Sequence, residues 1–319
     1  MDASRDIVSG TERADWRRRR LAMEAGREKH SPRRVRQRPQ WDTFNVLLKA
    51  FGVLLRAVRL YRRGFANALD IRLTRVDAVF ADLPEAFDGF RLLFLADLHA
   101  DGPRPLIDRA TGMVAQVEAD LCVLGGDYTW HVGVPPDAAA ERMTGLLRAV
   151  RAPAGTFAIL GNHDSAATVD TLEALGVRVL VNETHTIARD DAALQFTATD
   201  DVHYFFTDAA TAALDATPPG FRIALVHSAE LAGAVAERGF RLYLAGHTHG
   251  GQICLPGGRP IITHLTCHSG FGSGVWRLGS LYGYTSTGTG VSGLPVRFNS
   301  RGEVVLITLR RGPDGLFVA

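Results

Sequence analysis

The 319-residue sequence predicts a layered α/β fold, and three observations support that prediction. Five short apolar runs have the composition of buried strands, and each of them is followed by a polar cluster. Stretches with helical spacing lie between these runs, as they do in folds that alternate strands and helices. Strand-like segments later in the chain are less regularly separated by helices, which indicates a second sheet packed on the first.

The expected elements follow in chain order. The five apolar runs are residues 91–96, 121–124, 156–160, 221–226 and 241–245. The helical stretches are residues 106–118, 138–150, 169–175 and 229–239. Further strand-like segments are residues 178–181, 194–198, 282–287 and 303–309. The three cysteines show no paired pattern, so we expect a fold without disulfides in a reducing compartment.

Candidate metal ligands stand directly after the five apolar runs. They are Asp97, His99, Asp127, Asn162, His227, His247 and His249. Because open α/β sheets bind ligands beyond the carboxyl ends of their strands, we expect these side chains to converge. Carboxylate, amide and imidazole donors without a thiolate suit manganese, iron or zinc. Seven donors are too many for one tetrahedral ion, so the pattern predicts two divalent metal ions that share a bridging carboxylate.

The order of these motifs resembles that of the calcineurin-like metallophosphoesterases. The motifs are Asp-x-His, Gly-Gly-Asp, Gly-Asn-His-Asp, His and Gly-His-x-His, over residues 97–249. Residues 284–298 also look like the end of a bacterial subfamily of membrane-associated phosphodiesterases, some of which hydrolyse UDP-2,3-diacylglucosamine in lipid A synthesis. The resemblance implies a four-layer α-β-β-α sandwich with a dinuclear metal site at the carboxyl ends of the strands. It also implies that a metal-bridging hydroxide attacks a phosphodiester or pyrophosphate bond.

The resemblance assigns a role to each donor. The first ion would be held by Asp97, His99 and His249. The second ion would be held by Asn162, His227 and His247. Asp127 would bridge the two ions.

His163 would be the catalytic residue that assists departure of the leaving group, and it would not bind metal. Asp164 would accept a hydrogen bond and so orient a ligand. Many relatives carry an acid in the second motif that steadies the catalytic histidine, whereas this chain has Trp130 at that position. The sequence therefore leaves the orienting partner of His163 open.

Residues 1–63 differ in charge from the rest of the chain. They contain 17 basic and 7 acidic residues, although the whole chain has a net charge of only +2. Residues 1–40 lack apolar periodicity, which predicts a basic, disordered arm with at most a short helix near Leu21. Such an excess of basic residues indicates contact with an anionic surface.

Residues 41–67 combine an apolar stripe with a basic stripe at helical spacing, which predicts an amphipathic helix. An anionic membrane surface would suit this helix, and so would docking on its own domain or on a second subunit; we favour the membrane. The longest uncharged stretch, residues 50–55, is far shorter than the ~20 residues that cross a bilayer. We therefore expect a peripheral protein on the cytoplasmic face, without a transmembrane span, whose metallophosphoesterase domain is residues 68–319.

Three functions are compatible with this sequence. The favoured one is hydrolysis of a phosphodiester or pyrophosphate bond in a membrane lipid-linked substrate such as UDP-2,3-diacylglucosamine. A phosphodiesterase of nucleic acid or cyclic nucleotides would use the basic arm as a phosphate tether. However, the arm has no base-reading motif and the remaining chain is acidic, so nucleic acid is not an expected partner. A catalytically inactive scaffold would have no reason to retain all seven donors.

Some polar residues remain open at this stage. Arg297 would either bind a phosphate in bidentate fashion or be a solvated strand residue. Asp200 and Asp201 follow a predicted strand and are expected to form a turn at its end. His131 and His203 are expected on the surface, with lining of the cleft as the alternative.

Overall fold

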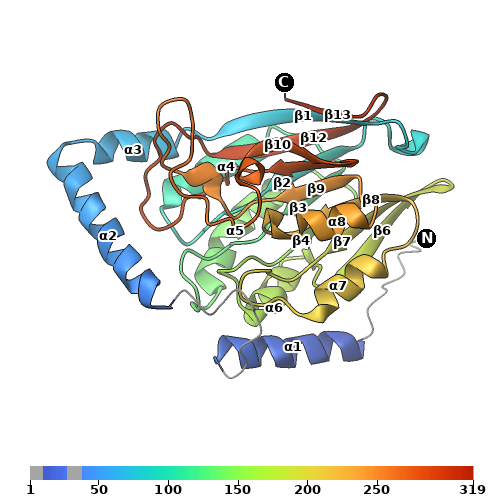
Figure 1. Ribbon diagram of the computed structural model, residues 1–319, viewed down its shortest axis with the longest axis horizontal. Coiled ribbons are helices and arrows are strands. Elements are labelled where there is room, and N and C mark those ends of the chain that lie inside the picture. The colour runs from blue at the N-terminus through green and yellow to red at the C-terminus, as the bar shows by residue number, and fades with distance from the viewer. Residues whose placement is uncertain (1–9, 27–37, 319) are drawn as a thin grey trace.

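Two β-sheets form the centre of the structure, a computed structural model that describes residues 10–26 and 38–318 (Figure 1). The first sheet has the strand order β13 Gly315–Val318, β1 Arg72–Phe80, β12 Glu303–Arg311, β2 Arg91–Leu95, β3 Leu121–Leu124, β4 Thr156–Ala158 and β5 Arg178–Val179. The second sheet has the order β10 Gly274–Leu278, β11 Leu281–Thr285, β9 Leu242–Ala245, β8 Phe221–Leu225, β7 Ala192–Ala198 and β6 Glu183–Arg189. The predicted second sheet is thereby confirmed.

Side chains alternate between the two faces of each strand, and this alternation builds the layers. In β2, Leu92 and Phe94 pack between the sheets, whereas Leu93 and Leu95 pack beneath helices. Those helices are α4 Arg104–Val114, α5 Asp137–Ala149 and α6 Ala166–Ala174. On the far face of the second sheet, Tyr243 packs with residues of α7 Asp208–Asp215 and α8 Ala232–Glu237. The predicted four-layer α-β-β-α sandwich is confirmed.

The strands that precede the candidate ligands run parallel to one another within each sheet. In the first sheet β2 pairs with β3 and β3 with β4, and in the second sheet β8 pairs with β9. Parallel neighbours end at the same edge of a sheet, and the two sheets are stacked. Residues from five distant parts of the chain are therefore brought to one rim of the sandwich.

The N-terminal part of the chain is more ordered than its composition predicts. Residues Gly10–Glu24 form a 15-residue helix, α1, that lies beside α6 (Figure 1). Arg20 and Met23 of this helix are buried, at 0% and 2% exposure, and Trp16 packs against the core below α4, α5 and α6. The prediction of a disordered arm was therefore wrong for this helix. One residue of its arginine-rich sequence, Arg20, is buried and has partners elsewhere in the fold, which composition alone does not reveal. Residues 1–9 and 27–37 lie outside the described residues.

The predicted single helix over residues 41–67 is two helices. They are α2, Arg38–Ala57, and α3, Tyr61–Ala68, which meet at a turn where Arg59 has a φ of 62°. Leu55 of α2 packs on Leu294 and Val296 of the domain. Docking of this segment on its own domain is thus part of the structure. No helix in the described part of the chain is long and apolar enough to cross a membrane.

Candidate metal centre

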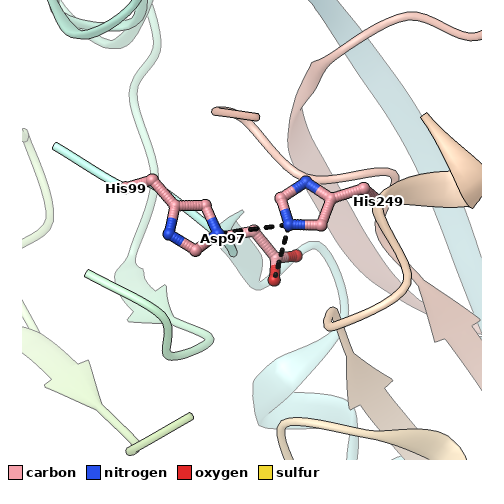
Figure 2. A group of neighbouring side chains, drawn as sticks. All are labelled: Asp97, His99 and His249. Atoms are coloured by element: carbon pink, nitrogen blue, oxygen red, sulfur yellow. Dashed lines mark hydrogen bonds and ion pairs between the residues drawn. The ribbon is translucent and has the colours of Figure 1, made fainter. Parts of the chain in front are cut away.

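Two clusters of metal-binding side chains lie at the carboxyl ends of the parallel strands. The first cluster consists of Asp97, His99 and His249 (Figure 2). The second cluster consists of Asp127, His227 and His247. Within each cluster the potential ligand atoms are all within 4.8 Å of one another. The structure therefore brings together six of the seven side chains that the sequence proposes as ligands.

Asp127 belongs to the second cluster and also faces the first. Its Oδ2 atom is 3.3 Å from Nε2 of His227 and 4.0 Å from Nε2 of His99. A carboxylate in this position can be shared by two ions. The remaining expected ligand, Asn162, lies against the second cluster, because its Oδ1 atom is 2.8 Å from Nδ1 of His247.

Backbone carbonyls fix the orientation of two of the imidazoles. Nδ1 of His99 donates to the carbonyl of Thr129 over 2.6 Å, and Nδ1 of His227 donates to the carbonyl of Gly125 over 2.7 Å. Each ring then presents the Nε2 lone pair to the site, which is how second partners orient metal-binding histidines. Nε2 of His99 faces Nε2 of His249 at 3.2 Å (Figure 2).

This arrangement fits a pair of divalent cations. Among the described residues, Nε2 of His227 is buried without a hydrogen-bond partner, and it faces Oδ2 of Asp127 at 3.3 Å. Buried polar atoms almost always have a partner, so this nitrogen indicates a site for a positively charged group. The donors are oxygen and imidazole nitrogen, which manganese, iron and zinc all accept.

Unusual backbone conformations are concentrated at the ligands. Positive φ angles, from 41° to 71°, occur at Asp97, His99, Asp127, His247 and His249. This left-handed region is uncommon for residues other than glycine, costs about 1–3 kcal/mol at each position and is concentrated at functional sites. The surrounding sandwich must therefore supply the stability that holds the ligand loops in place.

Two motif glycines let the ligand loops approach each other. A Cβ atom at Gly161 would lie 2.2 Å from Oδ1 of Asp127, and a Cβ atom at Gly246 would lie 2.6 Å from Oδ2 of Asp97. Any side chain at either position would push a carboxylate out of the site. The glycines of Gly-Asn-His-Asp and Gly-His-x-His are thus explained by close contact between motifs.

Burial and mutual proximity shift the pKa values of the ligands. Burial raises the pKa of Asp97 to about 7 and lowers the pKa of His99 to about 3. Burial alone would also lower the pKa of His227, but the carboxylates of Asp127 and Asp97 outweigh burial and raise that pKa to about 10. In the metal-free protein, a proton on His227 therefore balances part of the carboxylate charge.

Metal loading should release protons, because an imidazole must be neutral to bind a metal ion. At pH 8 we expect about one proton per protein, from His227. At pH 6 we expect about two, because Asp97 is then also protonated. Calorimetric titration with manganese in two buffers of different ionisation enthalpy would count the protons, and an absence of release at pH 8 would contradict the raised pKa of His227.

The same pKa shift sets the pH dependence of stability. The folded-state pKa of His227 lies above its usual value of 6.5, so its stabilising contribution is complete below pH 6.5 and is lost as the pH rises through 10. Chelation should therefore lower the Tm of the protein more at pH 9 than at pH 7.

His163 lies beside the clusters and belongs to neither. Its Nδ1 donates to the backbone carbonyl of Trp130 over 2.9 Å, and its Nε2 is 3.9 Å from Oδ2 of Asp127. The side chain is 17% exposed, so a substrate can reach it. The main chain at Trp130 thus orients His163, which answers the question that the sequence leaves open.

The carboxylate of Asp164 ties two motifs together. It accepts backbone N–H groups from Asp127 at 2.8 Å, Tyr128 at 2.9 Å and Gly161 at 2.8 Å. The sequence proposes that Asp164 orients a ligand. In the structure it holds the backbone of the expected bridging ligand, and it is fully buried in doing so.

Both sequence interpretations of Arg297 are wrong. Its side chain is completely buried and donates to the carbonyls of His249 at 3.0 Å, Thr287 at 2.7 Å and Gly290 at 2.7 Å. The side chain is therefore not solvated. Its two terminal nitrogens are already bound to backbone carbonyls, so they do not bind a phosphate. Instead it fixes the loop that carries a ligand of the first cluster.

His203 lies next to the second cluster, which agrees with the alternative expectation for this residue and not with the expected place on the surface. Its ring stacks on the ring of His247 with 4.1 Å between centroids. The backbone N–H groups of His203 and Tyr204 donate to Oδ2 of Asp201, so the turn expected after the strand is built around this carboxylate.

Comparison with known proteins agrees with this geometry. Residues 90–251 match the calcineurin-like phosphoesterase family. The chain is 31% identical over 243 residues to the uncharacterized metallophosphoesterase YkuE of Bacillus subtilis, covering 72% of this chain and 82% of that protein. It is 30% identical over 231 residues to the phosphodiesterase YaeI of Escherichia coli, covering 69% and 82%.

A shorter similarity links the chain to UDP-2,3-diacylglucosamine pyrophosphatase LpxG of Chlamydia trachomatis, with 32% identity over 110 residues, 33% of this chain and 32% of that protein. The motifs, the paired clusters and the matches over most of the chain lead to one conclusion. This protein belongs to the calcineurin-like phosphoesterase family and is a metal-dependent hydrolase of the phosphodiesterase type.

Proposed function

We propose that this enzyme hydrolyses a phosphodiester or pyrophosphate bond in a lipid-linked substrate at an anionic membrane surface. UDP-2,3-diacylglucosamine is the specific candidate, because LpxG, whose name gives that substrate, is similar to part of this chain. The observation that carries the membrane location is the exposed apolar face of α2.

The apolar face of α2 consists of residues that solvent reaches although the helix docks on the domain. They are Val46, Leu47, Val53 and Leu54, which are 54–65% exposed. The opposite edge of the helix packs on the domain through Leu48, Phe51 and Leu55. Lys49 and Arg56 are exposed beside the apolar face. An apolar face flanked by cations suits the boundary between acyl chains and anionic headgroups.

A second exposed apolar group lies beside the loop that carries His249. Ile261 and Ile262 are 59% and 45% exposed, and the Cβ position of Gly251 is only 3.2 Å from the carbonyl oxygen of Ile262. Gly251 comes two residues after His249 of the first cluster. In this proposal, an acyl chain that passes along this loop contacts these two side chains.

The residues of the centre have separable roles in this proposal. Asp97, His99 and His249 would hold one ion, Asn162, His227 and His247 the other, and Asp127 both. Two divalent ions, when bound, supply an activated water and neutralise charge on the phosphoryl oxygens.

His163 would donate a proton or a hydrogen bond to the leaving oxygen through Nε2. Its Nδ1 is already engaged with the carbonyl of Trp130, so only Nε2 is free for this task.

The substrate can be tested with the manganese-loaded protein and vesicles that contain UDP-2,3-diacylglucosamine, with UMP release as the readout. A parallel assay uses bis(p-nitrophenyl) phosphate in solution. We expect turnover of both substrates. Turnover of the soluble diester without UMP release would reject the lipid-linked substrate and leave the phosphoesterase activity in place.

Polar substitution of the apolar face of α2 should release the protein from membranes. We expect Leu47→Ser, Val53→Ser and Leu54→Ser together to weaken binding to phosphatidylglycerol vesicles by at least about tenfold, because each loses apolar area that the bilayer would bury. Flotation measures this binding, and hydrolysis of bis(p-nitrophenyl) phosphate should not change.

The matched control replaces two exposed apolar residues of β13, Phe317→Ser and Val318→Ser, which lie outside α2. This control should float like the wild type. If the α2 variant floats as well as the wild type, the membrane contact lies elsewhere. If the wild-type protein is retained on DNA at the same salt concentration and does not float with vesicles, a nucleic-acid substrate is favoured.

A further inference from the structure

We propose that helix α1 clamps the catalytic loop, and that Arg20 is a positioning residue that acts on hydrolysis through His163. Arg20 lies more than 140 residues before His163 in the chain and contacts no metal-binding side chain. The inference uses the proposed role of His163 at the leaving group and is independent of the identity of the substrate.

Each of the three nitrogens of the Arg20 guanidinium group has a hydrogen-bond partner. Nη1 donates to the carboxylate of Asp200, Nη2 donates to the backbone carbonyl of Asp164, and Nε donates to Glu24 over 2.9 Å. The group also lies 3.3 Å above the centroid of the Phe205 ring. Arg20 is fully buried and Asp200 is 1% exposed, so this is an ion pair within the protein interior.

Two neighbours on the same helix strengthen the contact. Oε1 of Glu24 accepts the backbone N–H of Ala166, the first residue of α6, at 2.8 Å. Nε1 of Trp16 donates to the second oxygen of Asp200 at 2.7 Å. Helix α1 therefore binds the segment Asp164–Ala166 through two side chains and binds Asp200 through two.

The clamped segment immediately follows His163. The carbonyl of His163 accepts from Oγ1 of Thr129 at 2.9 Å, and its backbone N–H donates to Oδ1 of Asp127 at 2.8 Å. These bonds hold the loop on the side of the metal centre, whereas Arg20 and Glu24 hold it from the side of α1. Loss of Arg20 removes the second support, and it leaves the Asp200 carboxylate buried without its partner, which favours undocking of α1.

A shift of this loop would move the His163 ring relative to the leaving oxygen. Asn162 is the one expected ligand on this loop, and the ligands of the first cluster come from other loops, so their geometry does not depend on α1. The expected consequence is a loss of general acid assistance with metal content retained. That loss must be larger for a poor leaving group than for a good one, because a good leaving group needs little protonation.

The test compares Arg20→Ala with Arg17→Ala. Both variants remove one positive charge from α1, but Arg17 makes only an exposed ion pair with Asp170. For Arg20→Ala we expect kcat to fall about tenfold on a phenyl diester and less than about threefold on bis(p-nitrophenyl) phosphate, with KM and metal content unchanged. For Arg17→Ala we expect wild-type values on both diesters.

A double variant shows whether Arg20 acts through His163. In a His163→Ala background, Arg20→Ala should cause no further loss. Equal losses on the two diesters, loss of bound metal, or an undiminished effect in the His163→Ala background would overturn the clamp. If His163→Ala alone leaves kcat unchanged, His163 has no catalytic role, and Arg20 does not act on hydrolysis through it.

Trp16→Phe keeps the test decisive if Arg20→Ala does not fold. It removes one hydrogen bond to Asp200 and leaves the buried charges paired. We expect the same dependence on the leaving group with a smaller amplitude. Wild-type kinetics of a folded Trp16→Phe protein on both diesters would count against the clamp.

Discussion

Replacement of Asp127 by Asn is expected to abolish hydrolysis and to lower metal occupancy at both clusters. Asp127 is 2% exposed, and Oδ2 lies 3.3 Å from His227 and 4.0 Å from His99, in different clusters. The amide keeps the shape of the side chain and removes the charge that two neighbouring cations would share. A loss of several kcal/mol of transition-state stabilisation corresponds to a fall in kcat of at least about 10³-fold.

Metal content and turnover should be measured on the same preparations of this variant. The matched control is Asp108→Asn on α4, an exposed carboxylate that pairs only with Arg104, and it should retain both metal and activity. Full occupancy of both sites in Asp127→Asn would show that this residue is not shared between two ions. Loss from one site alone would assign it to that site.

Replacement of His163 by Ala is expected to lower kcat by about 10²- to 10³-fold while metal content stays at the wild-type level. The ring is outside both clusters, its Nδ1 is bound to the carbonyl of Trp130, and its Nε2 is the only ring nitrogen left for the substrate. The loss should be largest for substrates with poor leaving groups.

His131→Ala is the control for this variant, because His131 is an exposed histidine that directly follows Trp130, whose carbonyl binds His163. It should retain wild-type turnover. Should His163→Ala lose a metal ion, His163 is a ligand and the assignment from the family resemblance is wrong.

The paired clusters could be anticipated from the sequence because their signals are local. Each ligand follows a short apolar run, and a run that ends at a sheet edge delivers the next polar side chain to that edge. The order of the five motifs then indicates which residues belong together. The same local logic predicts α4, α5 and both sheets.

Other elements carry weaker local signals and were not predicted. Strand β1 mixes arginine and aspartate with apolar residues, and α7 is only eight residues long. The break between α2 and α3 occurs at Arg59, whose positive φ is not typical of arginine. In these cases the neighbours in space decide the conformation.

The chain by itself determined the family, the candidate ligand set and the layered fold, because all three depend on residue types at fixed positions along strands. Only the tertiary structure decided the positions and partners of three residues, which the sequence alone does not indicate. Arg20 and Arg297 look solvated in an arginine-rich chain, yet both are buried, and Trp130 orients His163 through its backbone carbonyl. A buried charge or a main-chain acceptor depends on partners far away in the sequence, and no local pattern encodes where those partners lie.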